Sequence, residues 1–126
     1  MIGYIKGKIV HRGPNYITVA ANDIGYRVYA DQTSFAKEKE VELYIYHYIR
    51  EGVSELFGFK TKEESEVFEL LLGVSGVGPR VSLLIVSGLG PNKILSSIER
   101  GDASIFKTIS GVGAKVAAKI IVELKN

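Results

Sequence analysis

Two short glycine-rich stretches of this sequence carry the residue types that bind phosphate groups. Val74–Arg80 reads Val-Ser-Gly-Val-Gly-Pro-Arg, and 35 positions later Ile109–Lys115 reads Ile-Ser-Gly-Val-Gly-Ala-Lys. Glycine adopts positive φ at little cost, and its missing Cβ lets a ligand approach the backbone. Each stretch leads into a predicted helix, whose first N–H groups lack intrahelical acceptors. The pattern therefore predicts two anion sites at helix N-termini.

The cations that follow the glycines support this interpretation. Arg80 and Lys115 stand in the first turn of the expected helices, where the helix dipole disfavours a positive charge. An external anion is the partner that explains them. Neither stretch matches the dinucleotide fingerprint, and the phosphate loop ending in Gly-Lys-Ser/Thr is absent. We therefore expect the anion to be the phosphate of a polymer backbone.

The two stretches belong to an internal repeat. Val74–Leu89 aligns with Ile109–Leu124, and each copy reads as helix, glycine turn, helix. A unit of this size cannot bury its apolar faces alone. We predict that the two copies pack against each other about a pseudo-two-fold axis.

Composition restricts the remaining classes of protein. The 126 residues are 46% hydrophobic with a net charge of +2 and no cysteine, which excludes disulfides, zinc fingers and a thiol nucleophile. No apolar run is long enough to span a bilayer, and the N-terminus has no signal-peptide pattern. We expect a soluble cytoplasmic protein without membrane contact. Both halves carry nearly balanced charge, so nucleic-acid binding must depend on the local placement of cations.

The first half of the chain has the pattern of strands. Five Ile-, Val- and Tyr-rich segments are separated by turn residues within about 60 positions. A small closed barrel pairs the backbone N–H and C=O groups that so many short strands would otherwise expose at sheet edges. Five strands is the number in an OB-fold. An SH3-like barrel remains open on this evidence. The expected strands lie at 2–10, 15–21, 25–30, 41–49 and 55–59.

From Thr61 the period becomes helical. Thr61 and Glu64 form a capping box, and Pro79 and Pro91 suit the first positions of two further helices. Asp102 is expected to cap a fourth helix through Ile109, and a fifth runs from Ala114 to about Lys125. The fold class is α+β, with a barrel domain at 1–62 and an all-helical domain at 63–126, packed closely because the linker is short.

The glycine stretches also carry a family resemblance. Ser75–Arg80 and Ser110–Lys115, each flanked by helices, resemble paired helix-hairpin-helix motifs, which bind DNA phosphates without reading sequence. With the segments "MIGYIKGKIV", "GYRV", "YIREGVSELFGF" and "IIVELK", the chain is similar to the RuvA family over essentially all its residues. RuvA proteins are the DNA-binding subunits of the bacterial Holliday-junction branch-migration complex.

The resemblance implies a function and a set of site residues. Members form homotetramers, or face-to-face octamers, that hold a four-way DNA junction open for RuvB-driven branch migration in recombination, repair and the SOS response, with RuvC as a further partner. It implies no catalytic activity of the chain's own, no cofactor and no metal. Phosphates of the junction arms would meet backbone amides around Gly76, Val77, Gly78, Gly111, Val112 and Gly113, with charge supplied by Arg80, Lys115 and Lys119.

The family also carries an acidic pin in the barrel, in a loop that usually reads Arg-Glu-Asp. Here the loop reads Arg50-Glu51-Gly52, so Glu51 keeps one acid and the second is lost. Carboxylates beside the crossover would repel phosphates and keep the strands apart. The loss either weakens selectivity for junctions or is compensated by Glu55.

The family continues past the second hairpin, through a linker, to a small helical domain that contacts RuvB. The sequence ends at Asn126, and we expect it to bind junctions without recruiting RuvB.

Other interpretations of the sequence remain. The rival functions are a base-excision enzyme, for which only Glu123 lies beyond the hairpins, and a general single-strand or duplex DNA-binding scaffold. His11 and His47 lack spaced partners for a metal. The seven tyrosines can stack unpaired bases, although core and subunit contacts are the more frequent use of strand aromatics.

Overall fold

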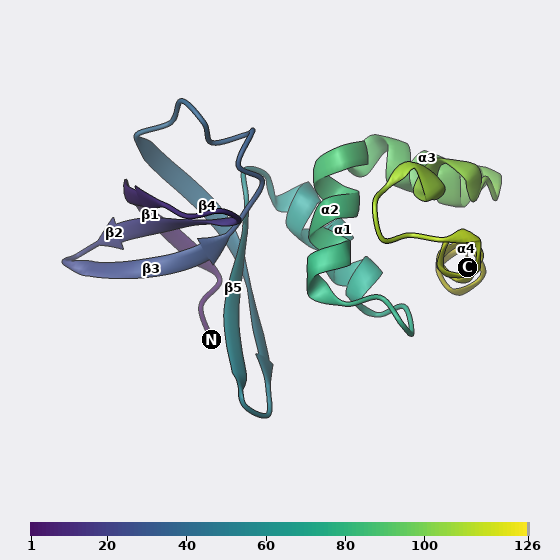
Figure 1. Cartoon of the computed structure of the whole chain (residues 1–126), viewed down its shortest axis with the longest axis horizontal. Helices are drawn as coiled ribbons and strands as arrows, with labels where there is room; N and C mark the ends of the chain where they lie inside the picture. Colours follow the sequence, from purple (N-terminus) through teal and green to yellow (C-terminus); the bar gives the residue numbers. More distant parts are fainter. Residues whose placement is uncertain (126) are drawn as a thin grey trace. The chain divides into compact units, whose positions relative to one another are not determined.

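We analysed a computed structural model of the chain, in which residues 1–125 are described; the last residue of the predicted second domain lies outside them. The chain forms two compact units, Met1–Ser65 and the part from Glu66 onward. Five strands precede the helices (Figure 1). The strands are β1 (Tyr4–Arg12), β2 (Tyr16–Ala21), β3 (Ile24–Tyr29), β4 (Glu40–Arg50) and β5 (Val53–Phe59).

The strands close into a barrel in the order β1-β2-β3-β5-β4. β1 pairs with both β2 and β4, and β3 closes the sheet on β5 in the one parallel pairing, Val28 with Leu56 and Tyr29 with Phe57. This five-stranded closed barrel is the OB-fold arrangement. The OB-fold expectation is confirmed, and the SH3-like alternative is excluded by the strand order.

The barrel core follows the alternation of the strands. In β2, Ile17 and Val19 are fully buried while Thr18 between them faces outward and is half-buried. A Cβ at Gly58 would lie 2.6 Å from a methyl carbon of Val28, so only glycine fits there on the inner face of β5. The buried barrel residues are Ile5, Ile17, Val19, Val28, Ala30, Phe35, Val41, Leu43, Ile45 and Leu56.

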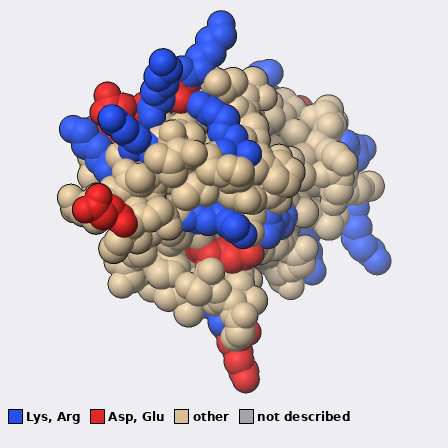
Figure 2. Space-filling view, turned by 60° about the vertical axis from the view of Figure 1, so that its left-hand side comes forward, with Lys and Arg blue, Asp and Glu red and all other residues tan. Residues whose placement is uncertain are grey.

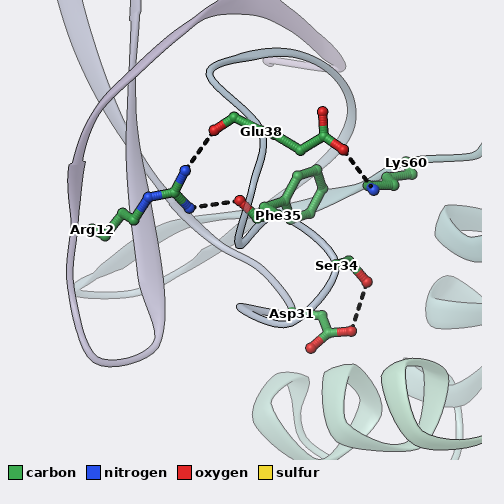
Figure 3. Close-up of polar contacts among 6 residues, drawn as sticks. All are labelled: Arg12, Asp31, Ser34, Phe35, Glu38 and Lys60. Carbon is green, nitrogen blue, oxygen red and sulfur yellow. Dashed lines mark hydrogen bonds and ion pairs between the residues drawn. The ribbon is translucent and has the colours of Figure 1, made fainter.

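The irregular loop between β3 and β4 is fixed by one arginine (Figure 3). The guanidinium of Arg12 donates to the carbonyl oxygens of Phe35 at 2.6 Å and Glu38 at 2.5 Å. Lys60 lies 3.2 Å from the Glu38 carboxylate and 5.1 Å from the centre of the Phe35 ring. These contacts hold the Phe35 side chain in the barrel core, where it is 2% exposed.

The hairpin of β4 and β5 extends beyond the closed part of the barrel, as Figure 1 shows. β1 pairs with β4 only as far as Tyr44, and β3 meets β5 only at Leu56 and Phe57. The pairing of β4 with β5 continues to Arg50 and Val53. The tip of this hairpin is therefore a two-stranded projection.

The second part of the chain is helical. α1 (Lys62–Leu72), α2 (Pro79–Leu89), α3 (Pro91–Arg100) and α4 (Ala114–Leu124) are α-helices, and η1 (Ser104–Thr108) is a 3-10 helix. In the described part of the chain no single helix is long and apolar enough to cross a membrane; α2 and α3 reach that length only together, bent by 97°.

The predicted helix starts are largely confirmed. The Glu64 N–H donates to Thr61 Oγ1 at 3.2 Å, and the Thr61 N–H donates to Glu64 Oε1 at 3.0 Å, which is the expected capping box. Pro79 and Pro91 occupy the first turns of α2 and α3.

The fourth predicted helix differs from the expectation. Asp102 does cap this segment, because its carboxylate accepts from the Ser104 hydroxyl at 2.6 Å and from the Ser104 N–H at 3.0 Å. These bonds hold the pKa of Asp102 below its usual value. The segment is, however, a five-residue 3-10 helix, since Phe106 and Ile109 bond back only three residues. A segment this short gains little from helix propagation, and short 3-10 turns are common as connectors between helices.

The two copies of the repeat have the same backbone conformation. Gly76 and Gly111 have φ values of 86° and 90°, in the left-handed region. Gly78 and Gly113 are both extended, with φ near −90°. Matching positions are buried in both copies: Val77 and Val112, Ser82 and Ala117, and Ile85 and Ile120.

The copies also pack against each other, as predicted. A Cβ at Gly88 would lie 2.6 Å from Ile109 Cδ1, so the second copy packs tightly against α2 at this glycine. The opposite contact brings Val81 of the first copy to 3.9 Å from a Cβ position at Gly111. Packing between the copies therefore fixes the two glycine turns relative to each other.

The left-handed glycines generate a stability prediction. Gly76→Ala or Gly111→Ala should lower the free energy of unfolding by about 1–2 kcal/mol, because a side chain at positive φ is strained. Urea unfolding followed by circular dichroism measures this. The matched variant Gly78→Ser should keep its stability, since its extended φ suits serine, a better N-cap than glycine. Equal losses at Gly76 and Gly78 would contradict the assignment of strain.

Candidate nucleic-acid interface

Both glycine turns end at a helix start that has no side-chain cap. The N-cap residues of α2 and α4 are Gly78 and Gly113, and neither supplies a side-chain hydrogen bond. The first amides bonded back into the helices are those of Ser82, to the Gly78 carbonyl, and Ala117, to the Gly113 carbonyl, both at 3.0 Å. The N–H groups of each first turn therefore have no acceptor within their own helix, and they lie at the positive end of the helix dipole.

Gly78 and Gly113 are not required by the fold. Their extended backbone is open to any residue, and a Cβ at either position would meet nothing within 4 Å. Glycine at these positions leaves the backbone bare toward the outside. This is the geometry expected where a phosphate approaches main-chain amides closely.

Val77 and Val112 have a different place in the turns. Their side chains are each 6% exposed, and their N–H groups donate to the carbonyls of Val74 and Ile109 at 3.0 Å. They anchor the turns in the core. The outward-facing donors of each turn are therefore those of the glycines and the first helical residues, a distinction that the sequence does not make.

The cations lie at the hairpins. Arg80 and Lys115 are exposed in the first turns of α2 and α4. Lys119, one turn further along α4, places its Nζ 3.5 Å from Ser75 Oγ in the first hairpin. A cation of the second copy thus lies beside the glycine turn of the first.

The contact between Glu123 and Ser75 in this site was not predicted from the sequence. The Ser75 N–H donates to Glu123 Oε1 at 3.2 Å, which ties the first hairpin to the end of α4. The spacing of Lys119 and Glu123, four residues apart on one helix face, is the available signal. Nothing local indicated that this face meets Ser75, 48 residues away.

The β4–β5 turn presents the second predicted element. Glu51 and Gly52 form the turn itself, and Glu51 is exposed. Figure 2 shows acidic atoms at the lower end of the molecule, where Figure 1 places this turn. Glu55 lies opposite Tyr48, back from the tip, and is half-buried. Its position differs from that of the missing second acid.

His47 forms hydrogen bonds within the barrel domain. His47 Nδ1 accepts from the Ile2 N–H at 3.2 Å, so its Nε2 carries the proton and donates to Ser54 Oγ at 2.9 Å. Within residues 1–125, no group of three or more His, Cys, Asp or Glu could hold a metal ion.

A five-stranded barrel followed by two uncapped glycine hairpins defines the class of tandem helix-hairpin-helix proteins with an N-terminal OB-fold. Comparison with known proteins identifies the family. Residues 1–58 match the model of the RuvA N-terminal domain, and residues 68–126 match that of the SAM-like helix-hairpin-helix tandem. The chain belongs to the RuvA family.

Curated relatives match along the whole chain. A protein of Rickettsia felis is 45% identical over 129 residues, one of Salinibacter ruber 39% over 130, and one of Acetivibrio thermocellus 35% over 130. Each is named Holliday junction branch migration complex subunit RuvA. The alignments cover 100% of this chain and 64% of each relative, so the chain spans slightly less than two thirds of their length.

The bare N-cap glycines generate a binding prediction. Gly78→Ser with Gly113→Ser should weaken binding to duplex DNA by about tenfold or more. The added Cβ blocks the backbone, and the serine hydroxyl caps the N–H groups that a phosphate would use. Fluorescence anisotropy measures the affinity, and urea unfolding should show unchanged stability. Ala118→Ser, which adds a hydroxyl to the exposed side of α4, is the control. Duplex affinity unaltered by the double variant would contradict the interface.

Proposed function

We propose that this chain binds four-way DNA junctions by their shape, through phosphate contacts at its two hairpins, and holds them open for branch migration. The observation that carries the proposal is the repetition of one turn. Gly76-Val77-Gly78 and Gly111-Val112-Gly113 have matching backbone angles, and both lead into uncapped helices. The names of its relatives as junction branch-migration subunits support the choice of DNA.

The contacts within each hairpin indicate which residues bind phosphate and which hold the turn in place. Amides at the glycines and first helical residues bind phosphate oxygens, while Val77 and Val112 fix the turns in the core. Arg80, Lys115 and Lys119 add positive charge. Contacts to phosphates position a protein on DNA without reading its bases. Selectivity must then come from the arrangement of several such sites in space.

An assembly of several copies supplies that arrangement. We propose a homotetramer, able to form an octamer, in which four chains contact the four arms. Glu51 on each projecting β4–β5 turn contributes one carboxylate at the centre, where it repels the phosphates of the crossing strands. In this proposal the chain performs no catalysis and binds no cofactor, and RuvB, with RuvC, acts on the junction it presents.

A competition experiment tests the function. A synthetic four-way junction should compete for this chain better than duplex or single strand of identical sequence, by about tenfold or more. A gel-shift with labelled junction in magnesium measures the preference. Glu51→Gln should reduce the difference in affinity between junction and duplex, because the repulsion of phosphates at the centre is removed. Equal competition by all three DNAs would favour the alternative of a general DNA-binding scaffold.

The phosphate contacts also predict how the affinity for DNA depends on salt concentration. Arg80→Ala with Lys119→Ala should reduce the slope of log affinity against log salt by about one unit for each phosphate that is no longer neutralised. Lys93→Ala with Arg100→Ala removes the same charge from α3, away from the hairpins, and should change the slope less. If both pairs alter the slope equally, the cations act through net charge alone.

A further inference from the structure

The outer face of the barrel carries a row of aromatic rings. Tyr16 of β2 is 6.2 Å from Tyr29 of β3, and Tyr29 is 5.4 Å from Phe57 of β5, between ring centroids. Phe57, itself buried, is 6.3 Å from Tyr48 of β4. The tyrosines of the row are half-buried. The row crosses four strands and is separate from the glycine hairpins in sequence and in the elements that carry it.

An arginine lies over the ring at one end of this row. The guanidinium carbon of Arg27 is 4.3 Å from the Tyr16 ring centroid. The ring itself is held in place, because a Cβ at Gly13 would fall 2.2 Å from Tyr16 Cε2 and the His11 ring lies 6.0 Å away. Arg27 is exposed and, within the described residues, forms no ion pair with a carboxylate. It is a planar cation held in one position.

The same arrangement occurs at the other end. The guanidinium carbon of Arg50 is 4.3 Å from the Tyr48 ring centroid, and Arg50 also donates to the Ile49 carbonyl at 2.8 Å. One arginine–tyrosine pair is thus next to the β1–β2 turn, and the other is next to the β4–β5 turn. In OB-folds, the β2–β3 face and these two turns are where oligonucleotides bind.

The charge of this face suits an anionic strand. Among the outward positions of β2, β3 and β5 and of β4 from Tyr44 onward, Glu55 is the one carboxylate, against Arg27 and Arg50. Guanidinium planes and aromatic rings both stack on unpaired bases, and arginine also attracts phosphate. Tyrosine and arginine are also enriched at interfaces between subunits, so a subunit contact is the alternative that the test below must separate from strand binding.

We propose that this face, from Arg27 on Tyr16 to Arg50 on Tyr48, binds single-stranded nucleic acid by stacking, as a second site independent of the hairpins. Unpaired bases stack on the outer sides of the two guanidinium groups. The chain then has one kind of site for duplex phosphates and another for the unpaired strand that appears when base pairs are exchanged.

The test uses the whole chain and a fluorescent oligo-dT of about 15 nucleotides, which cannot form a duplex. Anisotropy at low salt should give about tenfold weaker binding for Arg27→Ala, and a clear loss for Arg27→Lys, which keeps the charge but not the plane. Lys37→Ala removes one charge from the exposed β3–β4 loop and should have little effect. Circular dichroism checks that each variant folds.

Two further measurements separate this site from its alternatives. The Arg80→Ala, Lys119→Ala variant should keep its affinity for oligo-dT; if it loses that affinity, the strand binds at the hairpins and the proposal is wrong. Sedimentation velocity reports self-association. Arg27 variants that bind oligo-dT normally but change the oligomeric state would show a subunit contact here and would also overturn the proposal. Junction binding is measured separately and tests the hairpins, so its outcome does not depend on the outcome at this face.

Discussion

The start of a helix exposes N–H groups that must find acceptors, and this requirement organises the DNA-binding part of the chain. At α1 the chain satisfies it internally, because Thr61 and Glu64 cap each other's amides. At α2 and α4 it does not, because Gly78 and Gly113 have no side chain to offer. The contrast within one chain is informative. α3 also begins without a side-chain cap, after Gly90. What sets α2 and α4 apart is the repeated Ser-Gly-Val-Gly turn before each of them, with a cation at the second helical position, where an external anion would complete the hydrogen bonding.

The two hairpins pack in one core, and this packing sets the distance between the two anion sites. A Cβ at Gly88 would lie 2.6 Å from Ile109 Cδ1 and one at Gly111 would lie 3.9 Å from Val81, so the two copies pack closely at these positions. The hydrogen bond from Ser75 to Glu123 adds a polar tie across the same boundary. A pair of sites at fixed separation responds to the positions of phosphates along an arm rather than to the bases between them. Recognition of junction shape is the natural outcome of repeating such a pair in an assembly.

In the barrel the five strands pair with one another all the way round. The outer face of the sheet is therefore the part that can contact DNA. The β4–β5 hairpin, where Glu51 is exposed, projects beyond the closed part. The row from Tyr16 to Tyr48 occupies the outside of the same sheet, and its two arginines are held by rings rather than by carboxylates. The charge of each remains available to an anion. An acidic tip and a cationic, aromatic face on one barrel serve opposite purposes toward DNA, repulsion at one place and stacking at another.

The sequence by itself determined the features that depend on neighbours along the chain. The capping box, the prolines at the starts of α2 and α3, the five strands and the repeat all encode local hydrogen bonds or local periodicity, and the structure confirms them. The helix expected after Asp102 was wrong in type, because the segment forms a short 3-10 helix around the buried Phe106. Only the tertiary structure decided which amides of the turns face outward, that Glu123 reaches Ser75, and that Arg27 lies on Tyr16. Those contacts join residues whose meeting depends on how the copies pack and how the strands pair, and no local pattern carries that information.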